Sequence, residues 1–375
     1  MRILLLILSI VFGTSIAIRS QETFIYVSDA GNWNNPPWQI LKYDLDGNFI
    51  GVFTEEQMAW PQDIVFLDSV ALISNLNSGK INVHDKHSGD FIEVFAEGIG
   101  GPTRMKIGAD SLLYVLQWSG NGKVKRYELT GNFVDDFTSI GVNQSIGLDW
   151  DSVGNLYVSS FGQDLVQRFD ANGIWTDTFI DSALVGPTNI WFAENGTLFV
   201  ADYNEGSIKT FDPNGTYITS LITGLSQCEG ISILENGNML IGNGGTAAVK
   251  QFASNGAFLT DLIPSSLGGL LRPNAVVLHE EVMPDSNDSL TSVPYLHQPS
   301  ARISPLQGEQ FYIDEEPALL SRYQVWNMRG EIVVEGRLTT QLIWDATDQP
   351  EAVYFITVEL TSGEIVRQRV VKAAP

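Results

Sequence analysis

The sequence predicts an all-β chain in which a six-bladed β-propeller is followed by a small β-sandwich. Three observations lead to this prediction: a repeat of about 42 residues, four short apolar runs in each repeat, and one repeat that is divided between two distant segments. An aromatic residue or a histidine marks the repeat at steps of 41 to 43 residues. The marking positions are Tyr43, His84, Tyr127, Phe169, Phe211 and Phe252. A fixed period of this size is the signature of a repeat architecture.

One complete repeat shows how a unit is composed. Its four runs are PTNIWF (187–192), TLFVAD (197–202), SIKTFD (207–212) and TYITSLI (216–222), and turns rich in Gly and Asn separate them. Short runs of Val, Ile, Phe and Tyr between such turns indicate β-strands. Four antiparallel strands in about 42 residues describe one propeller blade.

The number of blades follows from where the repeats begin. Complete repeats start near Pro61, Pro102, Ser145, Pro187 and Cys228. A further first strand, PNAVVLH (273–279), has no partners after it, whereas three unassigned strands lie at 23–29, 38–44 and 48–53. We therefore expect these segments to share a sixth blade, which closes the ring and removes its exposed strand edges. An open β-solenoid is the alternative, and the divided repeat argues against it.

These repeats resemble the NHL-repeat and gluconolactonase-like six-bladed propellers. The residues that carry the resemblance are P-x-N-I (187–190), NGTLFVAD (195–202) and IKTFDPNG (208–215), with counterparts in the other repeats. The resemblance covers about residues 22–282. It implies the fold more strongly than a function, because such propellers include hydrolases, lyases and binding modules.

The segments on either side of the repeats have simpler interpretations. Residues 1–20 have the pattern of a signal peptide: a basic start, a short apolar run over 4–13, and small residues near a cleavage position. The apolar run is too short for a comfortable membrane span, although a retained anchor is an alternative. We expect no transmembrane segment in the mature chain. Residues 283–300 are polar and contain prolines, which is typical of a linker.

Charge and cysteine content limit the possible partners. The chain has 44 acidic and 21 basic residues among 375, a formal net charge of −23. Nucleic acids and anionic membrane surfaces are therefore unfavourable partners. The one cysteine, Cys228, excludes an internal disulfide framework, and we expect it to be a packing residue rather than a nucleophile.

Residues 301–375 are predicted to form a second, smaller β unit. The segments 325–333, 343–360 and 362–372 resemble the C-terminal sorting domain of the type IX secretion system of Gram-negative Bacteroidetes. The chain departs from that pattern at Ile303-Ser304-Pro305, where Asn-Pro is usual, and at Ala352, where Gly is common. The resemblance implies that the type IX machinery is a partner. It also implies export through the periplasm and outer membrane, to the medium or the outer cell surface. An ordinary adhesive sandwich domain is the alternative.

Alignment of the second strands of the repeats brings six polar residues to one position. These are Asp29, Asn75, Gln117, Ser160, Asp202 and Asn243. In an antiparallel blade this position lies at the same end as the start of the first strand, where Arg104 stands in the third repeat. We therefore expect a polar funnel around the axis on one face of the ring. Capping of turns by these side chains is the alternative.

Aromatic residues follow the polar position directly in three consecutive repeats. They are Trp118, Phe161 and Tyr203. Flat apolar rings beside converging polar groups suit a glycan, a peptide or a small molecule. The predicted ligand-binding residues are thus Asp29, Asn75, Gln117, Asp202, Asn243, Arg104, Trp118, Phe161 and Tyr203. Packing of the rings within their loops is the alternative.

The resemblance also implies a candidate metal site. Gluconolactonase-like propellers hold a divalent cation with Glu, Asn and Asp side chains at the axis, and hard cations prefer such oxygen ligands. In this chain Glu229, Asn189 and Asp63 stand at axial positions, but their order around the ring differs from the family and Arg104 adds a positive charge. Calcium or magnesium in the axis is therefore a hypothesis.

Two functions remain compatible with the sequence. The first is a secreted or cell-surface propeller that binds a ligand, with no catalytic residue assigned. The second is a metal-dependent, lactonase-like hydrolase that uses Glu229, Asn189, Asp63 or Asp202.

Overall fold

The computed structural model describes residues 21–282 and, further on, residues 303–304, 307–308, 310–313, 320–327, 332–337, 340, 342–350, 352–360 and 365–372. The chain divides into two compact units, Met1–Asp285 and Ser286–Pro375. The segments interpreted as a signal peptide and a linker lie outside the described residues.

The first unit is built from six four-stranded antiparallel sheets. The first sheet has the order β24-β1-β2-β3, with β1 (Gln21–Asp29), β2 (Gln39–Asp44), β3 (Phe49–Thr54) and β24 (Pro273–Val282). The second has β4 (Pro61–Phe66), β5 (Val70–Asn75), β6 (Lys80–Asp85) and β7 (Phe91–Ala96), and the third has β8 (Pro102–Ile107), β9 (Leu113–Gln117), β10 (Lys125–Tyr127) and β11 (Phe133–Asp136). The repeated four-strand pattern predicted from the sequence is thereby confirmed.

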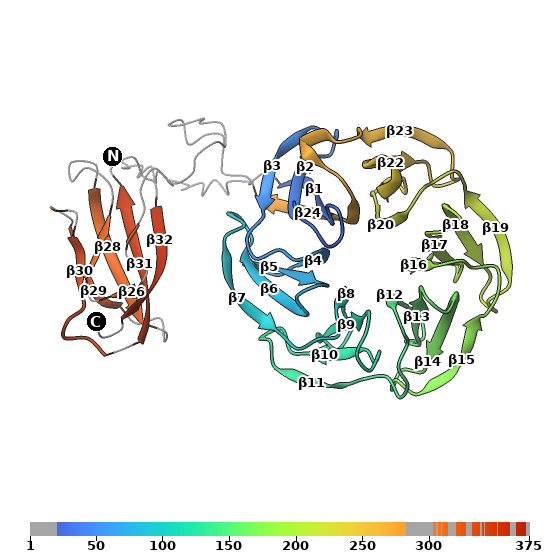
Figure 1. Ribbon diagram of the computed structural model, residues 1–375, viewed down its shortest axis with the longest axis horizontal. Coiled ribbons are helices and arrows are strands. Elements are labelled where there is room, and N and C mark those ends of the chain that lie inside the picture. The colour runs from blue at the N-terminus through green and yellow to red at the C-terminus, as the bar shows by residue number, and fades with distance from the viewer. Residues whose placement is uncertain are drawn as a thin grey trace, which may run out of the picture. The chain divides into compact units, whose positions relative to one another are not determined.

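The remaining three sheets continue the same order. The fourth has β12 (Ser145–Trp150), β13 (Leu156–Ser160), β14 (Leu165–Phe169) and β15 (Trp175–Ile180), and the fifth has β16 (Pro187–Phe192), β17 (Leu198–Asp202), β18 (Ser207–Phe211) and β19 (Tyr217–Ile222). The sixth has β20 (Cys228–Ile233), β21 (Met239–Asn243), β22 (Ala248–Phe252) and β23 (Phe258–Ile263). Two short 3-10 helices, η1 (Gly244–Thr246) and η2 (Leu267–Gly269), lie in the loops near the end of this series. In Figure 1 the sheets surround a common centre, which the first strand of each sheet faces, and this arrangement is consistent with a β-propeller.

The first sheet joins distant parts of the chain. Strand β24 pairs with β1 along its length, so that Phe24 lies opposite His279 and Glu22 lies opposite Glu281. Glu281 also binds side chains of the sheet, since its carboxylate lies 2.6 Å from the Lys42 amine and accepts a hydrogen bond from the Tyr26 hydroxyl. The divided repeat predicted from the sequence is confirmed by this pairing.

Apolar side chains fill the space between each sheet and the next. Among residues 21–282 there are six buried clusters, and each combines residues from two neighbouring sheets. The cluster between the sixth and first sheets includes Leu240 and Val249 on one side and Val27 and Leu41 on the other. Burial of this kind contributes about 25 cal/mol for each Å² of apolar surface removed from water. The packing therefore continues around the whole ring without a gap between sheets.

The second unit contains two further sheets among its described residues. The three-stranded sheet has the order β25-β27-β30, with β25 (Ile303–Ser304), β27 (Gln310–Ile313) and β30 (Leu342–Asp345). The five-stranded sheet has the order β26-β32-β31-β28-β29, with β26 (Gln307–Gly308), β28 (Leu320–Asn327), β29 (Ile332–Arg337), β31 (Ala352–Leu360) and β32 (Ile365–Lys372). Side chains from both sheets, including Phe311, Trp344 and Ile356, share one buried cluster.

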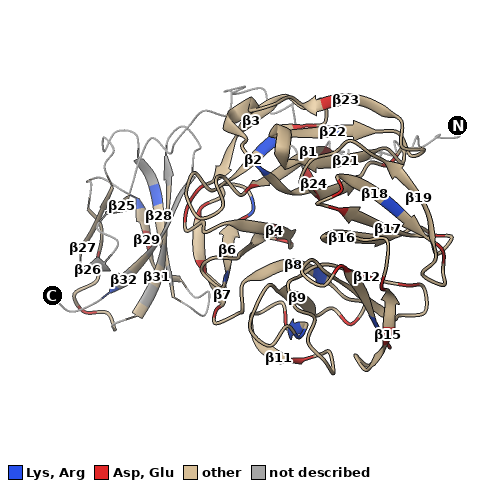
Figure 2. Cartoon of the chain, turned by 45° about the vertical axis from the view of Figure 1, so that its right-hand side comes forward, with Lys and Arg blue, Asp and Glu red and all other residues tan. Residues whose placement is uncertain are grey.

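Among the residues that the structure describes, no helix has the length and apolar character needed to cross a membrane. Acidic positions are spread over many loops of the ring, and basic positions are fewer and scattered (Figure 2).

Candidate functional site on the Asp29 face

One side of the ring, which we call the Asp29 face, is where second strands end and first strands begin. The registers show this in every sheet; for example, Asn75 pairs with Pro61 and Asp202 pairs with Pro187. The six polar residues predicted to share a position do so, because each is the last residue of its second strand. They are Asp29, Asn75, Gln117, Ser160, Asp202 and Asn243. All six are buried, with at most 2% of each residue exposed.

The side chains of these six residues bind the loop that leads into the first strand of their own sheet. Each contacts the backbone of the residue two positions before that strand. The N–H donors are Leu271 to Asp29, Ala59 to Asn75, Gly100 to Gln117, Val185 to Asp202 and Ser226 to Asn243, and Ser160 instead donates to the Asn143 carbonyl. Such contacts are those of the capping alternative. A ligand-binding role for these residues stays a prediction.

The two buried carboxylates among these six residues, Asp29 and Asp202, have different electrostatic environments. Desolvation raises the pKa of Asp29, although four hydrogen bonds from Gly31, Arg272, Gln39 and Leu271 oppose it. Asp202 instead has a buried cation beside it, with the Lys209 amine 2.7 Å from its Oδ2 atom. Both carboxylates are therefore surrounded by donors from the protein itself.

Arg104, for which a ligand-binding role stays a prediction, connects four sheets across the axis. Its side chain is only 5% exposed, and the guanidinium Nη2 atom lies 3.1 Å from Glu229 Oε1. The guanidinium also donates to the backbone carbonyls of Gln62 and Asn274. These partners belong to β20, β4 and β24, so one side chain from β8 reaches around the centre of the ring. Its donors are largely used inside the protein.

The residues predicted to hold a metal are only partly brought together. Asp63 accepts a hydrogen bond of 2.9 Å from the Met105 N–H, and it interacts with the charge of Arg104, as Glu229 does. Desolvation raises the pKa of both Asp63 and Glu229, and Arg104 opposes this shift. Asn189 is more exposed than either acid. Among the described residues, no three His, Cys, Asp or Glu side chains are grouped as metal ligands.

The three aromatic residues on the Asp29 face form a continuous strip, which we call the aromatic arc. Phe161 lies in the middle, with its ring centroid 5.6 Å from that of Trp118 and 5.6 Å from that of Tyr203. The rings are tilted or perpendicular to each other, an arrangement that the quadrupoles of aromatic rings favour. All three residues are half-buried, so part of each remains open to solvent.

Arg272 extends the aromatic arc over the sixth sheet. Its guanidinium lies near enough to the Tyr203 hydroxyl to lower the pKa of that group, and it donates to Gln227 Oε1. On the other side it lies over the ring of Trp33, 3.8 Å from the centroid. Burial raises the pKa of Tyr203, and Glu229 adds to this shift while Arg272 opposes it.

Two local features explain why the Arg272 side chain lies over Trp33 on the Asp29 face. In the other five sheets the residue before the first strand has a positive φ; these residues are Trp60, Gly101, Gln144, Gly186 and Gln227. Arg272 does not share this conformation, and both its N–H and that of Leu271 donate to Asp29. The sixth sheet also leaves space, because Gly244 occupies the position that Tyr203 occupies in the fifth. A Cβ on Gly244 would lie 3.3 Å from Arg272 Cγ and 3.1 Å from the Gln227 carbonyl oxygen.

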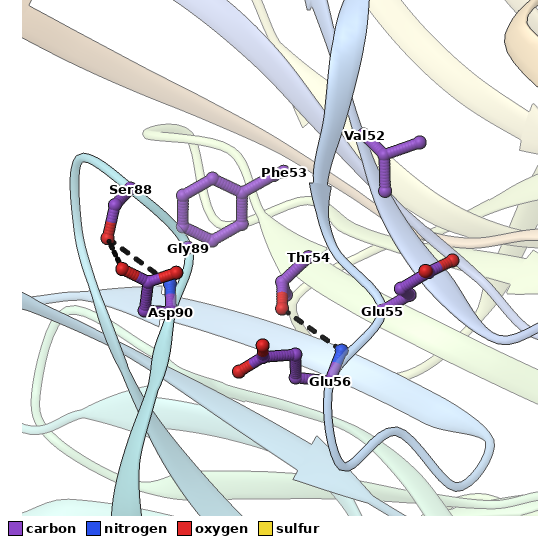
Figure 3. A pocket seen from close by; sticks show the side chains of 8 residues that line it. All are labelled: Val52, Phe53, Thr54, Glu55, Glu56, Ser88, Gly89 and Asp90. Carbon is purple, nitrogen blue, oxygen red and sulfur yellow. Dashed lines mark hydrogen bonds between the residues drawn. The ribbon is translucent and has the colours of Figure 1, made fainter. Parts of the chain in front are cut away.

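A separate pocket of about 300 Å³ lies between the end of β3 and the turn that joins β6 to β7 (Figure 3). It is rich in acids, among them Glu56 and Asp90, but these are already bonded. Glu56 Oε2 accepts from the Phe91 N–H at 2.9 Å, and Asp90 Oδ2 accepts from the Ser88 hydroxyl at 2.8 Å. None of the residues of the aromatic arc lines this pocket.

Arg272, Gln227 and Gly244 were not predicted from the sequence to belong to this face. One signal was present, since Gly244 interrupts the aromatic series when second strands are aligned. The path of the Arg272 side chain had no such signal, because it depends on a loop conformation that differs from the other five.

No family model matches the chain, and no curated protein matches it. The fold does resemble solved structures. One is a protein of unknown function from Bacteroides caccae, 15% identical with a TM-score of 0.55, and the match covers 68% of this chain and 98% of that protein. Another comes from a nidogen/laminin complex, 14% identical with a TM-score of 0.56, and the match covers 69% of this chain and 98% of that one. At these identities the likeness shows the fold alone.

A gluconolactonase-like protein is more distant. It is 16% identical with a TM-score of 0.47, and the match covers 55% of this chain and 78% of that protein. This likeness is too weak to bear on function.

Proposed function

We propose that the chain is a secreted six-bladed, NHL-type β-propeller that binds a ligand through the aromatic arc on the Asp29 face. The observation that carries this proposal is the contiguous contact of Trp118, Phe161 and Tyr203, which leaves part of each ring open to solvent. Half-buried rings next to polar groups offer both apolar area and orientation to a glycan, a peptide or a small molecule. The six sheets with clusters between every neighbouring pair support the blade count.

The same observations give less support to the lactonase-like hydrolase. A metal-dependent hydrolase needs several oxygen ligands that converge on one open position. Here the Glu229 carboxylate pairs with Arg104, and Asp63 binds the backbone of Met105. The positive charge of Arg104 is unfavourable for a cation at this place. The binding function is therefore the one we propose.

We further propose that residues 301–375 are a type IX secretion sorting domain with a sandwich fold, which directs the propeller to the cell surface or the medium. Support comes from the sequence segments named above and from a separate buried cluster in the second unit. Deletion of residues 301–375 in a host with this secretion system is expected to leave the protein in the periplasm, as fractionation would show. Unchanged release of the truncated chain would contradict the proposal.

Ligand binding is tested with the full chain on an array of glycans and peptides. Trp118→Ala is expected to weaken binding of any ligand found by at least about tenfold, because it removes one end of the aromatic arc. The matched control is Trp175→Ala, since Trp175 is 43% exposed on the outer strand β15. Equal loss in both variants, or no effect in either, would contradict the proposed site. Loss of binding in EDTA, together with lactone hydrolysis, would favour the hydrolase instead.

A further inference from the structure

We infer that the ligand of the aromatic arc is an acidic saccharide whose carboxylate binds Arg272. This inference rests on the proposed function, because it specifies the ligand of the same site. It concerns the end of the arc at the sixth sheet, where Arg272 interacts with Tyr203 and lies over the ring of Trp33.

The charge of Arg272 has no acidic partner within bonding distance. None of the ion pairs among the described residues includes it. Its neighbours Gln227, Tyr203 and Trp33 are neutral, and Glu229 interacts with it only at longer range. The other three arginines among residues 21–282, Arg104, Arg126 and Arg168, each pair with a carboxylate. A guanidinium fits a carboxylate with two parallel hydrogen bonds, so an external acid suits this group.

Arg272 also has an unused donor. Its Nε atom is buried and has no hydrogen-bond partner. A buried donor without an acceptor is unfavourable, so an acceptor that reaches it is bound more strongly than at an exposed donor. The Nε and Nη2 atoms form one edge of the guanidinium, and a carboxylate that reaches this edge from the side of the arc would accept from both.

The surrounding residues hold the Arg272 side chain in position. Stacking on Trp33 holds the plane of the guanidinium, and Gln227 fixes one of its edges. Gly244 provides the space, since a Cβ there would come within 3.3 Å of Arg272 Cγ. An arginine held by stacking and by a neutral acceptor keeps its charge available and loses little freedom on binding.

The aromatic arc favours a saccharide as the acidic ligand. Trp118, Phe161 and Tyr203 present partly open rings in a row that leads to Arg272. Sugar rings cover such rings with their C–H faces, while their hydroxyls remain available to the solvent and to polar groups at the rim. A uronic acid carries its carboxylate on the ring itself, so one residue of the saccharide can reach Arg272 while its neighbours lie on the arc. An acidic peptide is the competing outcome of the test.

The test measures binding of the full chain to a panel of oligouronates, with their methyl esters as matched neutral probes. We expect at least one oligouronate to bind, its ester to bind at least about tenfold more weakly, and the affinity for the acid to fall with added salt. Arg272→Gln is expected to abolish this preference for the acid. Gly244→Ala, which keeps every charge, is expected to weaken binding of the acid several-fold by displacing Arg272.

The control is Arg168→Gln, because Arg168 lies on β14 and pairs with Asp177, outside the aromatic arc. It should leave binding unchanged. Equal binding of acid and ester, or full binding by Arg272→Gln, overturns the inference but not the proposed function, provided that Trp118→Ala still weakens binding at least about tenfold. Arg272-dependent binding of acidic peptides without any oligouronate overturns the saccharide assignment. If Arg272→Gln does not fold, the comparison of acid with ester on the unmodified chain still decides.

Discussion

The axis contains Arg104 and the Asp29 face contains Arg272. The two arginines differ in whether the protein itself neutralises their charge. Arg104 is enclosed, with a carboxylate at 3.1 Å and two backbone carbonyls as acceptors. Arg272 is half-buried, lies over Trp33 and has only neutral hydrogen-bond partners. The first arrangement contributes to the stability of the ring, whereas the second leaves a positive charge that a ligand can use.

This difference follows from where each residue stands. Arg104 belongs to a first strand that faces the centre of the ring. It is buried there, and a buried charge needs a partner. Arg272 belongs to a loop, whose position against solvent permits a charge without a partner. Binding sites on repeat folds of this kind are therefore more readily built in loops than on the strands that hold the ring together.

The largest expected effect is the loss of Arg104. Arg104→Met leaves Glu229 and Asp63 without their cation, and we expect the free energy of unfolding to fall by about 3–5 kcal/mol. Arg272→Met should lower it by no more than about 1 kcal/mol, as for a cation–π contact near the surface. Urea denaturation of both variants measures the difference. Equal losses would mean that the two arginines have the same structural role.

The effect of Arg104→Met should also depend on pH. Without the cation, burial holds the pKa of Glu229 and Asp63 further above the ordinary values of 4.5 and 3.8. The folded state then binds more protons than the unfolded state, so its stability falls as pH rises above those values. The destabilisation is expected to be larger at about pH 8 than at about pH 5. The double variant Arg104→Met/Glu229→Gln should recover part of the loss at the higher pH, and no recovery would contradict the role of Glu229 as the main partner.

A smaller effect on stability is expected from Asn75→Ala, which distinguishes a capping role of Asn75 from a ligand-binding role. Asn75→Ala removes the acceptor of the Ala59 N–H, which lies 2.8 Å from it, and we expect a loss of about 1–2 kcal/mol in the free energy of unfolding. If Asn75 serves only its loop, ligand affinity should change less than about twofold, unlike that of Trp118→Ala. The control is Asn77→Ala, an exposed position in the following loop. Abolished binding by the folded Asn75 variant would restore the ligand role predicted from the sequence.

Features that depend on residues close together in the sequence could be predicted, and features that depend on contacts between distant residues could not. The strands follow from local composition and turns, and the pairing of β24 with β1 follows from counting strands, as the residues 273–279 without partners show. The position shared by Asp29, Asn75 and the other four residues also follows from alignment. Their contacts with the preceding loops do not, because polar side chains at one position are compatible with a ligand and with a cap.

The axis and the end of the aromatic arc were less predictable. Arg104 pairs with Glu229 across 125 positions of sequence, and no local pattern indicates that partner. Arg272 reaches its place through a backbone conformation that departs from five equivalent loops and through the missing side chain of Gly244. Both features arise from three-dimensional exceptions to the repeat, which an alignment of repeats averages away.

The pairing of β1 with β24 has a consequence for how the ring is made. Residues 273–282 are the last part of the ring to leave the ribosome. One edge of β1, and the side of the apolar cluster that Val276 and Leu278 complete, therefore stay uncovered until then. Pairing of segments so far apart is slow, and uncovered strand edges invite association between chains. Five sheets can form in the order of synthesis, but the first sheet is complete only when β24, the last strand of the unit, has been made. A nascent chain stalled before residue 273 is therefore the form of this protein with the greatest need for a chaperone.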